Sequence, residues 1–237
     1  MLRSIKQLYG DKLGASDGDI GHVKDFYFDD QNWAVRYLVA DTGSWLPGRQ
    51  VLISPHSISS LAPDGKVLRV NLTREQIGNC PAIETHKPVS RQYEEEYHRY
   101  YGWPFYWQGD GLGGLSGFPI LDLPPGPTPG VSEKTIGPRS ERADAHLRST
   151  RAVNGYHLQS GEEIIGHVCD FRVDARSWAI GELVVKTGHR LSGKEVMIPA
   201  KDVERISYET STVFVKGSKV SIEHLTATAP APAGAED

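Results

Sequence analysis

A histidine and an aspartate stand three positions apart in a six-residue motif that the sequence contains twice. The motif, Gly-His-Val-x-Asp-Phe, covers residues 21–26 and recurs at 166–171, 145 positions later. An imidazole titrates near neutral pH and a carboxylate can accept a proton, so the motif has the residue types of an acid–base or pH-sensing site. A site that is needed once is not expected in both copies beside different neighbours, Lys24 in one and Cys169 in the other. The duplication therefore favours a structural role.

The repeated side chains are interpreted accordingly. We expect His22 and His167 to lie on strands in a structural or surface position. We expect Asp25 and Asp170 to cap a loop or to accept backbone N–H bonds, each within its own copy. The predicted structural signature of the fold consists of Gly21, Asp25, Trp33, Gly166, Asp170 and Trp178.

Two glycine-rich stretches match nucleotide-binding motifs only in part. Residues 188–194 fit all but the last position of a P-loop, but Glu195 stands where Ser or Thr should bind magnesium, and a strand is expected to follow instead of a helix. Residues 109–114 have the letters of a dinucleotide-binding fingerprint, but they follow aromatic residues instead of a strand. We interpret the first stretch as a hairpin loop and the second as part of a linker.

The remaining reactive residue types show no arrangement for catalysis. The nine histidines have no close metal-ligand spacing, and the two cysteines, Cys80 and Cys169, form no Cys-x-x-Cys pair and are predicted to be reduced thiols. No nucleophile–base arrangement is identified from spacing. We therefore predict no catalytic residue, no metal, no cofactor and no enzymatic activity. A net charge of -4 argues against a nucleic-acid partner.

The two copies extend well beyond the motif. When residues 2–77 are laid over 147–222 without a gap, about 24 of the 76 positions are identical. Each copy begins with Leu-Arg-Ser and continues with short apolar runs that turn residues separate. This pattern predicts about six short strands per copy, in a small barrel or sandwich.

Local signals refine this expectation in the first copy. Gly21 interrupts the apolar pattern of residues 19–28, which predicts a bent or bulged strand. The turn residues 29–32 lead to Trp33 and a further β-rich run, which together predict a hairpin. Residues 73–76, Thr-Arg-Glu-Gln, have the form of a capping box and predict a short helix.

The segment between the copies differs in composition. A tyrosine stripe at helical spacing is formed by Tyr93, Tyr97, Tyr100 and Tyr101. Gly102 is expected to end this helix, Trp103 and Trp107 continue its aromatic character, and residues 109–130 are rich in Gly and Pro. We predict one barrel at 1–79, an aromatic helix and linker at 80–146, a second barrel at 147–225 and a disordered tail at 226–237.

The repeated motif, the Trp-Ala hairpin, the Thr-Gly loop and the Val-x-Ile strand together resemble the PRC-barrel family. This resemblance covers both copies and implies a mainly β fold of two small PRC-type β-barrels, joined by the aromatic helix and the Gly/Pro-rich linker. The family includes the cytoplasmic part of the photosynthetic reaction centre H subunit and the C-terminal domain of a ribosome maturation factor. The membrane helix of the former and the N-terminal domain of the latter have no counterpart in this sequence. The resemblance implies a barrel that docks onto a larger assembly.

The functional hypothesis is a non-enzymatic adaptor that binds a protein assembly in the cytoplasm. We expect the contacts to come from the aromatic segment and one exposed loop, namely from Tyr93, Tyr97, Tyr100, Tyr101, Trp103, Trp107 and Trp45. The same aromatic stripe could instead pack against the barrels in cis. Three alternatives stay open: a small-ligand or pH-sensing module in which the cleft between the barrels holds the ligand and His22 and His167 titrate, an accessory of photosynthetic electron transfer, and a homodimer.

The sequence also carries a prediction of location. Residues 1–10 lack the apolar run of a signal peptide, and no stretch approaches the roughly 18 to 20 apolar residues of a membrane span. We therefore expect a cytoplasmic protein that reaches a membrane only by peripheral docking onto a membrane complex.

Overall fold

The computed structural model describes residues 2–46, 49–61, 66–80, 97–103, 146–187 and 193–216, with the side chains of residues 60 and 61 left out. One compact unit consists of Met1–Gly78 and His146–Asp237, and a second of Asn79–Ala145. Both repeat copies thus belong to the first unit. The predicted Gly/Pro-rich linker and the tail at 226–237 lie outside the described residues.

The first copy forms a sheet of six of its own strands in the order β5-β4-β3-β2-β7-β6. These strands are β2 (Lys12–Ala15), β3 (Gly18–Asp29), β4 (Ala34–Asp41), β5 (Gln50–Ile53), β6 (Ile58–Leu61) and β7 (Val67–Val70). Neighbouring strands are antiparallel except for β2 and β7, which run parallel. The prediction of about six strands is confirmed.

The second copy repeats this sheet in the order β12-β11-β10-β9-β14-β13. Its strands are β9 (His157–Ser160), β10 (Glu163–Asp174), β11 (Ile180–Thr187), β12 (Glu195–Pro199), β13 (Val203–Ser207) and β14 (Thr212–Val215). Short 3-10 turns at η2 (Pro55–Ser57) and η4 (Ala200–Asp202) precede β6 and β13. The fold is mainly β, as the sequence predicts.

The pairing register is the same in both copies. Phe26 pairs with Leu38 as Phe171 pairs with Leu183, and the register shifts between Val23 and Asp25 as it does between Val168 and Asp170. The predicted bulge in the long strand is therefore present in both copies. It places Lys24 in one copy and Cys169 in the other, which are the residues by which the two motifs differ.

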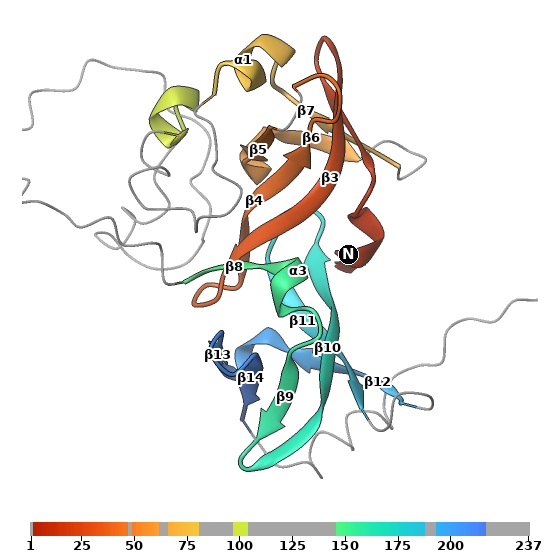
Figure 1. Cartoon of the computed structure of the whole chain (residues 1–237), viewed down its shortest axis with the longest axis vertical. Coiled ribbons are helices and arrows are strands. Elements are labelled where there is room, and N and C mark those ends of the chain that lie inside the picture. The colour runs from red at the N-terminus through yellow and green to blue at the C-terminus, as the bar shows by residue number, and fades with distance from the viewer. Residues whose placement is uncertain are drawn as a thin grey trace, which may run out of the picture. The chain divides into compact units, whose positions relative to one another are not determined.

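Each sheet receives a seventh strand from the other copy. Strand β1 (Leu2–Ser4) pairs with β10, and β8 (Leu147–Ser149) pairs with β3. Leu2 stands opposite Asp174, and the equivalent Leu147 stands opposite Asp29. In Figure 1 the green β8 lies along the orange-red β3 accordingly. The two copies have exchanged their first strands.

Short helical turns follow the exchanged strands and carry apolar side chains into the core. They are η1 (Lys6–Leu8) and α3 (Thr150–Val153). Ile5 and Thr150, which occupy equivalent positions, are both fully buried. The Ile5 N–H donates to the Phe171 carbonyl at 2.9 Å. Burial of a side chain the size of isoleucine stabilises a fold by about 1.5 to 3 kcal/mol, so the exchange is part of the core.

Two predictions of helix boundaries are confirmed. The N–H of Thr73 donates to Gln76 Oε1 at 2.9 Å and the N–H of Gln76 to Thr73 Oγ1 at 3.1 Å, which is a reciprocal capping box at the start of α1 (Arg74–Gly78). Residues 97–101 are helical, and Gly102 follows with φ 69°. The Trp103 N–H then donates to the His98 carbonyl at 2.9 Å, so glycine ends this helix as expected.

Candidate functional site

The repeated aspartate of the first copy binds the first strand of the second. Asp25 accepts hydrogen bonds from the hydroxyls of Ser149 at 2.5 Å and Thr150 at 3.0 Å, and from the N–H of Arg151 at 3.1 Å. The N–H of Phe26, in its own copy, also donates to it at 2.7 Å. The expectation that this carboxylate serves its own copy is therefore incomplete, because most of its donors come from the other.

Asp170 repeats the arrangement with the first strand of the first copy. It accepts hydrogen bonds from the Ser4 hydroxyl and from the N–H of Lys6 at 2.9 Å. The N–H of Phe171 donates to it at 2.8 Å. A charged acceptor roughly doubles the strength of such a bond relative to a neutral pair. The duplicated aspartates thus fasten the two exchanged strands.

Burial affects the titration of the groups around this junction. It raises the pKa of Asp25, while hydrogen bonds from Ser149 and the Arg151 backbone oppose the change. It also raises the pKa of Tyr9 to about 12. With this pKa the phenol remains protonated at physiological pH. The Tyr9 hydroxyl lies 2.8 Å from Oγ1 of the buried Thr150 and forms a hydrogen bond with it.

The motif glycines are required by a close approach of two strands. A Cβ on Gly21 would collide with the carbonyl oxygen of Asp41, and a Cβ on Gly166 would collide with that of Lys186. Gly21 also has φ 127°, which favours glycine. The space is closed by backbone atoms, which cannot move aside as a flexible side chain could. The two signature glycines are therefore required for steric reasons.

The two signature tryptophans join the copies through their backbones. Trp33 and Trp178 have φ values of 50° and 57°, which are rare for bulky residues. The Trp33 carbonyl accepts the N–H of Ile180 at 2.7 Å, and the Trp178 carbonyl accepts the N–H of Val35 at 2.9 Å. Between these bonds Ala34 pairs with Ala179. The strained turns are thus held by reciprocal bonds across the interface.

Aromatic rings fill the space behind this bridge. The Phe26 ring stacks on Trp178 with centroids 5.8 Å apart, and Phe28 meets Phe171 at 5.4 Å. Each of these four residues except Phe28 has the same residue type at the equivalent position of the other copy. All four side chains are buried. The motif phenylalanines and Trp178 therefore belong to one core that the two copies share.

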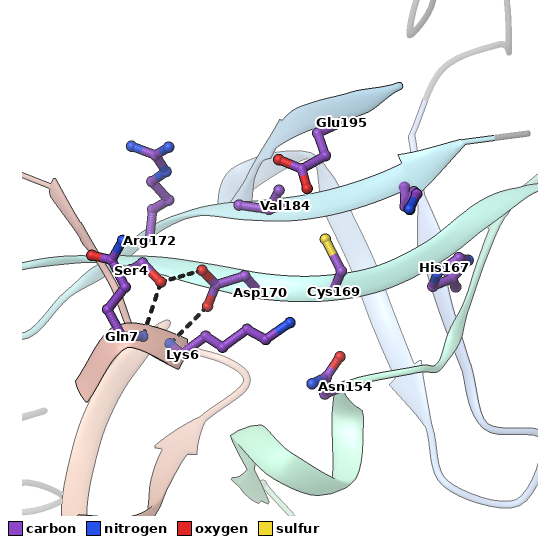
Figure 2. A pocket seen from close by; sticks show the side chains of 11 residues that line it. Ser4, Lys6, Gln7, Asn154, His167, Cys169, Asp170, Arg172, Val184 and Glu195 are labelled. Atoms are coloured by element: carbon purple, nitrogen blue, oxygen red, sulfur yellow. Dashed lines mark hydrogen bonds between the residues drawn. The ribbon is translucent and has the colours of Figure 1, made fainter. Parts of the chain in front are cut away.

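A polar cavity of about 500 Å³ lies beside Asp170. Its lining consists of Ser4, Lys6 and Gln7 of the first copy, Asn154 after α3, and residues of β10, β11 and β12. Figure 2 shows Lys6 running along Asp170 toward Cys169, with the Glu195 carboxylate directed at the same thiol from β12. Burial raises the pKa of Cys169, and the negative charge of Glu195 adds to the effect.

Comparison with known proteins identifies the fold of the second copy. Residues 154–222 match the family model of the PRC-barrel domain. The chain carries a PRC-barrel domain. The predicted family is thereby confirmed for the second copy. The family model does not extend to the first copy, whose strands pair in the same register. No curated protein matches the sequence.

The PRC-barrel motif histidines differ in their surroundings. His22 is exposed, whereas His167 is half-buried and lines the polar cavity. Of the two histidines that the pH-sensing alternative names, His167 lines this cavity, whereas His22 is not among its described lining residues. That alternative stays a hypothesis.

The segment resembling a P-loop ends in a strand of the PRC barrel. Lys186, before the segment, pairs with Glu195, after it, in the antiparallel ladder of β11 and β12. Residues 188–192 lie outside the described part, but the flanking ladder makes this connection a hairpin, as predicted. Within the described ranges, no group of three or more His, Cys, Asp or Glu side chains is placed to hold a metal ion. Cys80 and Cys169, both described, form no disulfide.

The aromatic segment forms a ring cluster of its own. Tyr97 is fully buried, and its ring contacts those of Tyr101 at 4.9 Å and Trp103 at 5.6 Å. Tyr101 and Trp103 stack at 4.3 Å, and the 43% exposed Tyr100 ring stands edge-on to Tyr101 at 4.8 Å. Burial, reinforced by Cys80, raises the pKa of Tyr101. Tyr97 is thus a core residue of the cluster, and Tyr100 is its most exposed described ring.

Three further residues were predicted to contact a partner, and none of them is an exposed ring of the described structure. Trp45 is half-buried, with the Arg74 guanidinium 4.8 Å above its ring. Tyr93 and Trp107 lie outside the described residues. No helix among the described residues is long and apolar enough to cross a membrane.

The residues that sequence reasoning missed are the donors on the exchanged strands. They are Ser4, Lys6, Ser149 and Thr150. The sequence signal for them was the Leu-Arg-Ser with which each copy begins. Three identical residues at the start of both copies indicate that this segment makes the same contact in each. The spacing alone could not show that each serine reaches the aspartate of the other copy.

Proposed function

We propose that this protein is a non-enzymatic docking module, in which two interlocked barrels form a rigid body and the aromatic cluster binds a protein partner. The aromatic cluster is defined as Tyr97, Tyr100, Tyr101 and Trp103. PRC-barrel domains are generally non-catalytic. In this chain the repeated carboxylates also hold the exchanged strands, which supports a role without chemistry.

One observation carries the proposal: a well-packed ring cluster leaves a large aromatic side chain on its surface. Tyr100 is 43% exposed while its ring edge meets Tyr101. Tyrosine and tryptophan are the residues most enriched among interface hot spots, because they bury large areas at low entropic cost. A ring already held by its neighbours loses little further freedom when a partner covers it.

The experiment is quantitative affinity capture from an extract of the source cell, with the intact protein and Tyr100→Ala as baits. The matched control is Tyr208→Ala, since the Tyr208 ring is also 43% exposed but belongs to the second barrel. We expect Tyr100→Ala to lower recovery of the partner at least about tenfold, the effect of a hot-spot residue, and Tyr208→Ala to leave it unchanged.

Equal recovery with all three baits would remove the aromatic cluster from the proposal. Gel filtration with light scattering on the same proteins separates docking onto another protein from self-association. Fractionation of the extract before capture shows whether the partner is a membrane complex. A cytoplasmic location belongs to the same proposal and is tested by that fractionation.

A further inference from the structure

One of the residues that line the polar cavity differs from the residue at the equivalent position of the first copy. Asn154 lines the cavity, and the equivalent residue 145 positions earlier is Tyr9. The Tyr9 ring lies 6.2 Å from Phe26, with the Arg151 guanidinium 4.9 Å above it. Arg151 is in turn the equivalent of Lys6, which lines the cavity. A tyrosine under an arginine thus occupies the place where the second copy has an asparagine beside an open space.

The charges around the cavity also set the two copies apart. Lys186 of the second copy corresponds to Asp41 of the first, and Glu195 corresponds to Gln50. Arg172 is a further cation that lines the cavity, where the first copy has Tyr27, and the neutral Cys169 stands where the first copy has Lys24. Asp170, the other anion there, already accepts three hydrogen bonds, from Ser4, Lys6 and Phe171.

The lining determines what kind of molecule can bind. Among the described residues that line the cavity, Val184 alone has a purely apolar side chain, so an apolar ligand would leave polar groups without partners. Lys6, Arg172 and Lys186 supply donors for a carboxylate, and Glu195 supplies an acceptor for an ammonium group. A volume of about 500 Å³ lies in the range of small-molecule sites.

We propose that the cavity between the first strand of copy one and β10–β12 of copy two is a binding site for a small zwitterion of the free amino-acid class. Its carboxylate binds Lys6 and Lys186, and its ammonium group binds Glu195. Because Lys6 follows the exchanged strand, an occupied site also ties that strand more firmly to the second barrel. The site is separate from the aromatic cluster, so this inference does not rest on the docking function.

The test measures binding of the twenty standard amino acids to the full chain by thermal shift at roughly 5 mM, followed by calorimetry of those that stabilise it. We expect at least one to raise the unfolding midpoint. Its N-acetyl and amide derivatives, which lack the ammonium or the carboxylate, should bind at least about tenfold more weakly. A peptide with the same terminal residue distinguishes a free amino acid from a chain end.

Two variants introduce the residues of the first copy. Asn154→Tyr fills the cavity as Tyr9 fills its own position, and Lys186→Asp replaces a carboxylate donor with the residue found at position 41. Each should weaken binding at least about tenfold, while the exposed Lys201→Asp, a matched charge reversal outside the cavity, should not. Circular dichroism checks folding, and if Asn154→Tyr does not fold, Lys186→Asp decides.

Two results would overturn the proposal. The first is that no amino acid shifts the midpoint. The second is binding that survives Lys186→Asp or is equally strong with the N-acetyl and amide derivatives. Neither result affects the docking proposal, because that proposal is tested separately by affinity capture with Tyr100→Ala.

Discussion

Ser149 donates a 2.5 Å hydrogen bond to Asp25, a residue 124 positions earlier in the chain. Ser4 makes the same bond to Asp170 across 166 positions. In both cases the serine belongs to one copy of the repeat and the aspartate to the other. The two barrels therefore form one intertwined body, whatever the path of the chain that connects them.

Cleavage of the connecting segment should leave the two copies associated. With a protease site inserted in residues 109–130, we expect both fragments to elute together at the mass of the intact chain. Separation would pull Ile5 and Thr150, both fully buried, out of the other copy's core. Gel filtration before and after digestion measures this, and fragments that elute separately would contradict the intertwined arrangement.

A variant tests whether the serine–aspartate bonds contribute to this association. Ser4→Ala with Ser149→Ala should lower the free energy of unfolding by about 1.5 to 3 kcal/mol for each bond to a charged acceptor. Ser59→Ala is the control, because its exposed hydroxyl donates to the Arg69 carbonyl on a neighbouring strand and not to a carboxylate. Urea titration of the uncleaved proteins gives both values.

Alanine at the motif glycines should be far more costly than at a glycine with open surroundings. A Cβ on Gly21 would collide with the Asp41 carbonyl oxygen, so we expect Gly21→Ala to cost about 2 to 4 kcal/mol. Gly78 has no atom within 4 Å of a new Cβ and lies in α1, so Gly78→Ala should be neutral or stabilise by up to about 1 kcal/mol. Equal losses in urea unfolding would mean that the strand approach is not the reason for the glycine.

Removal of the half-buried carboxyl group at Asp25 should change how stability depends on pH. Burial raises the pKa of Asp25, so its native state favours the protonated form. The stability this contributes is fully present below the unfolded pKa, about 3.9, and is lost as pH rises through the native pKa. Asp25→Asn has no such loss. The free energy of unfolding of Asp25→Asn minus that of wild type should therefore increase with pH and then level off.

Urea titrations at a series of pH values from acid to neutral measure this difference. Asp19→Asn serves as the control because Asp19 is exposed on the same strand. A difference for Asp25→Asn that does not change with pH would show that the carboxylate titrates alike in the folded and unfolded chains.

The site was predictable to the extent that its residues act locally. Thr73 and Gln76 cap their own helix, and Gly102 ends its own, because these bonds span only a few residues. The role of Asp25 was only partly predictable, because three of its four donors are more than 120 residues away. The burial of Tyr97 likewise depends on which side of a helix is covered, which helical spacing cannot tell.

The sequence by itself determined the repeat, the strand pattern, the bulged motif and the family. These follow from alternation of side chains, turn residues and short-range hydrogen bonds, which leave their trace in adjacent positions. Only the tertiary structure decided that the first strands are exchanged and that Asn154 borders an open polar cavity where Tyr9 stands in the first copy. The physical reason is that an identical Leu-Arg-Ser strand fits either barrel equally well by sequence, and only the packing of the whole chain selects which one it joins.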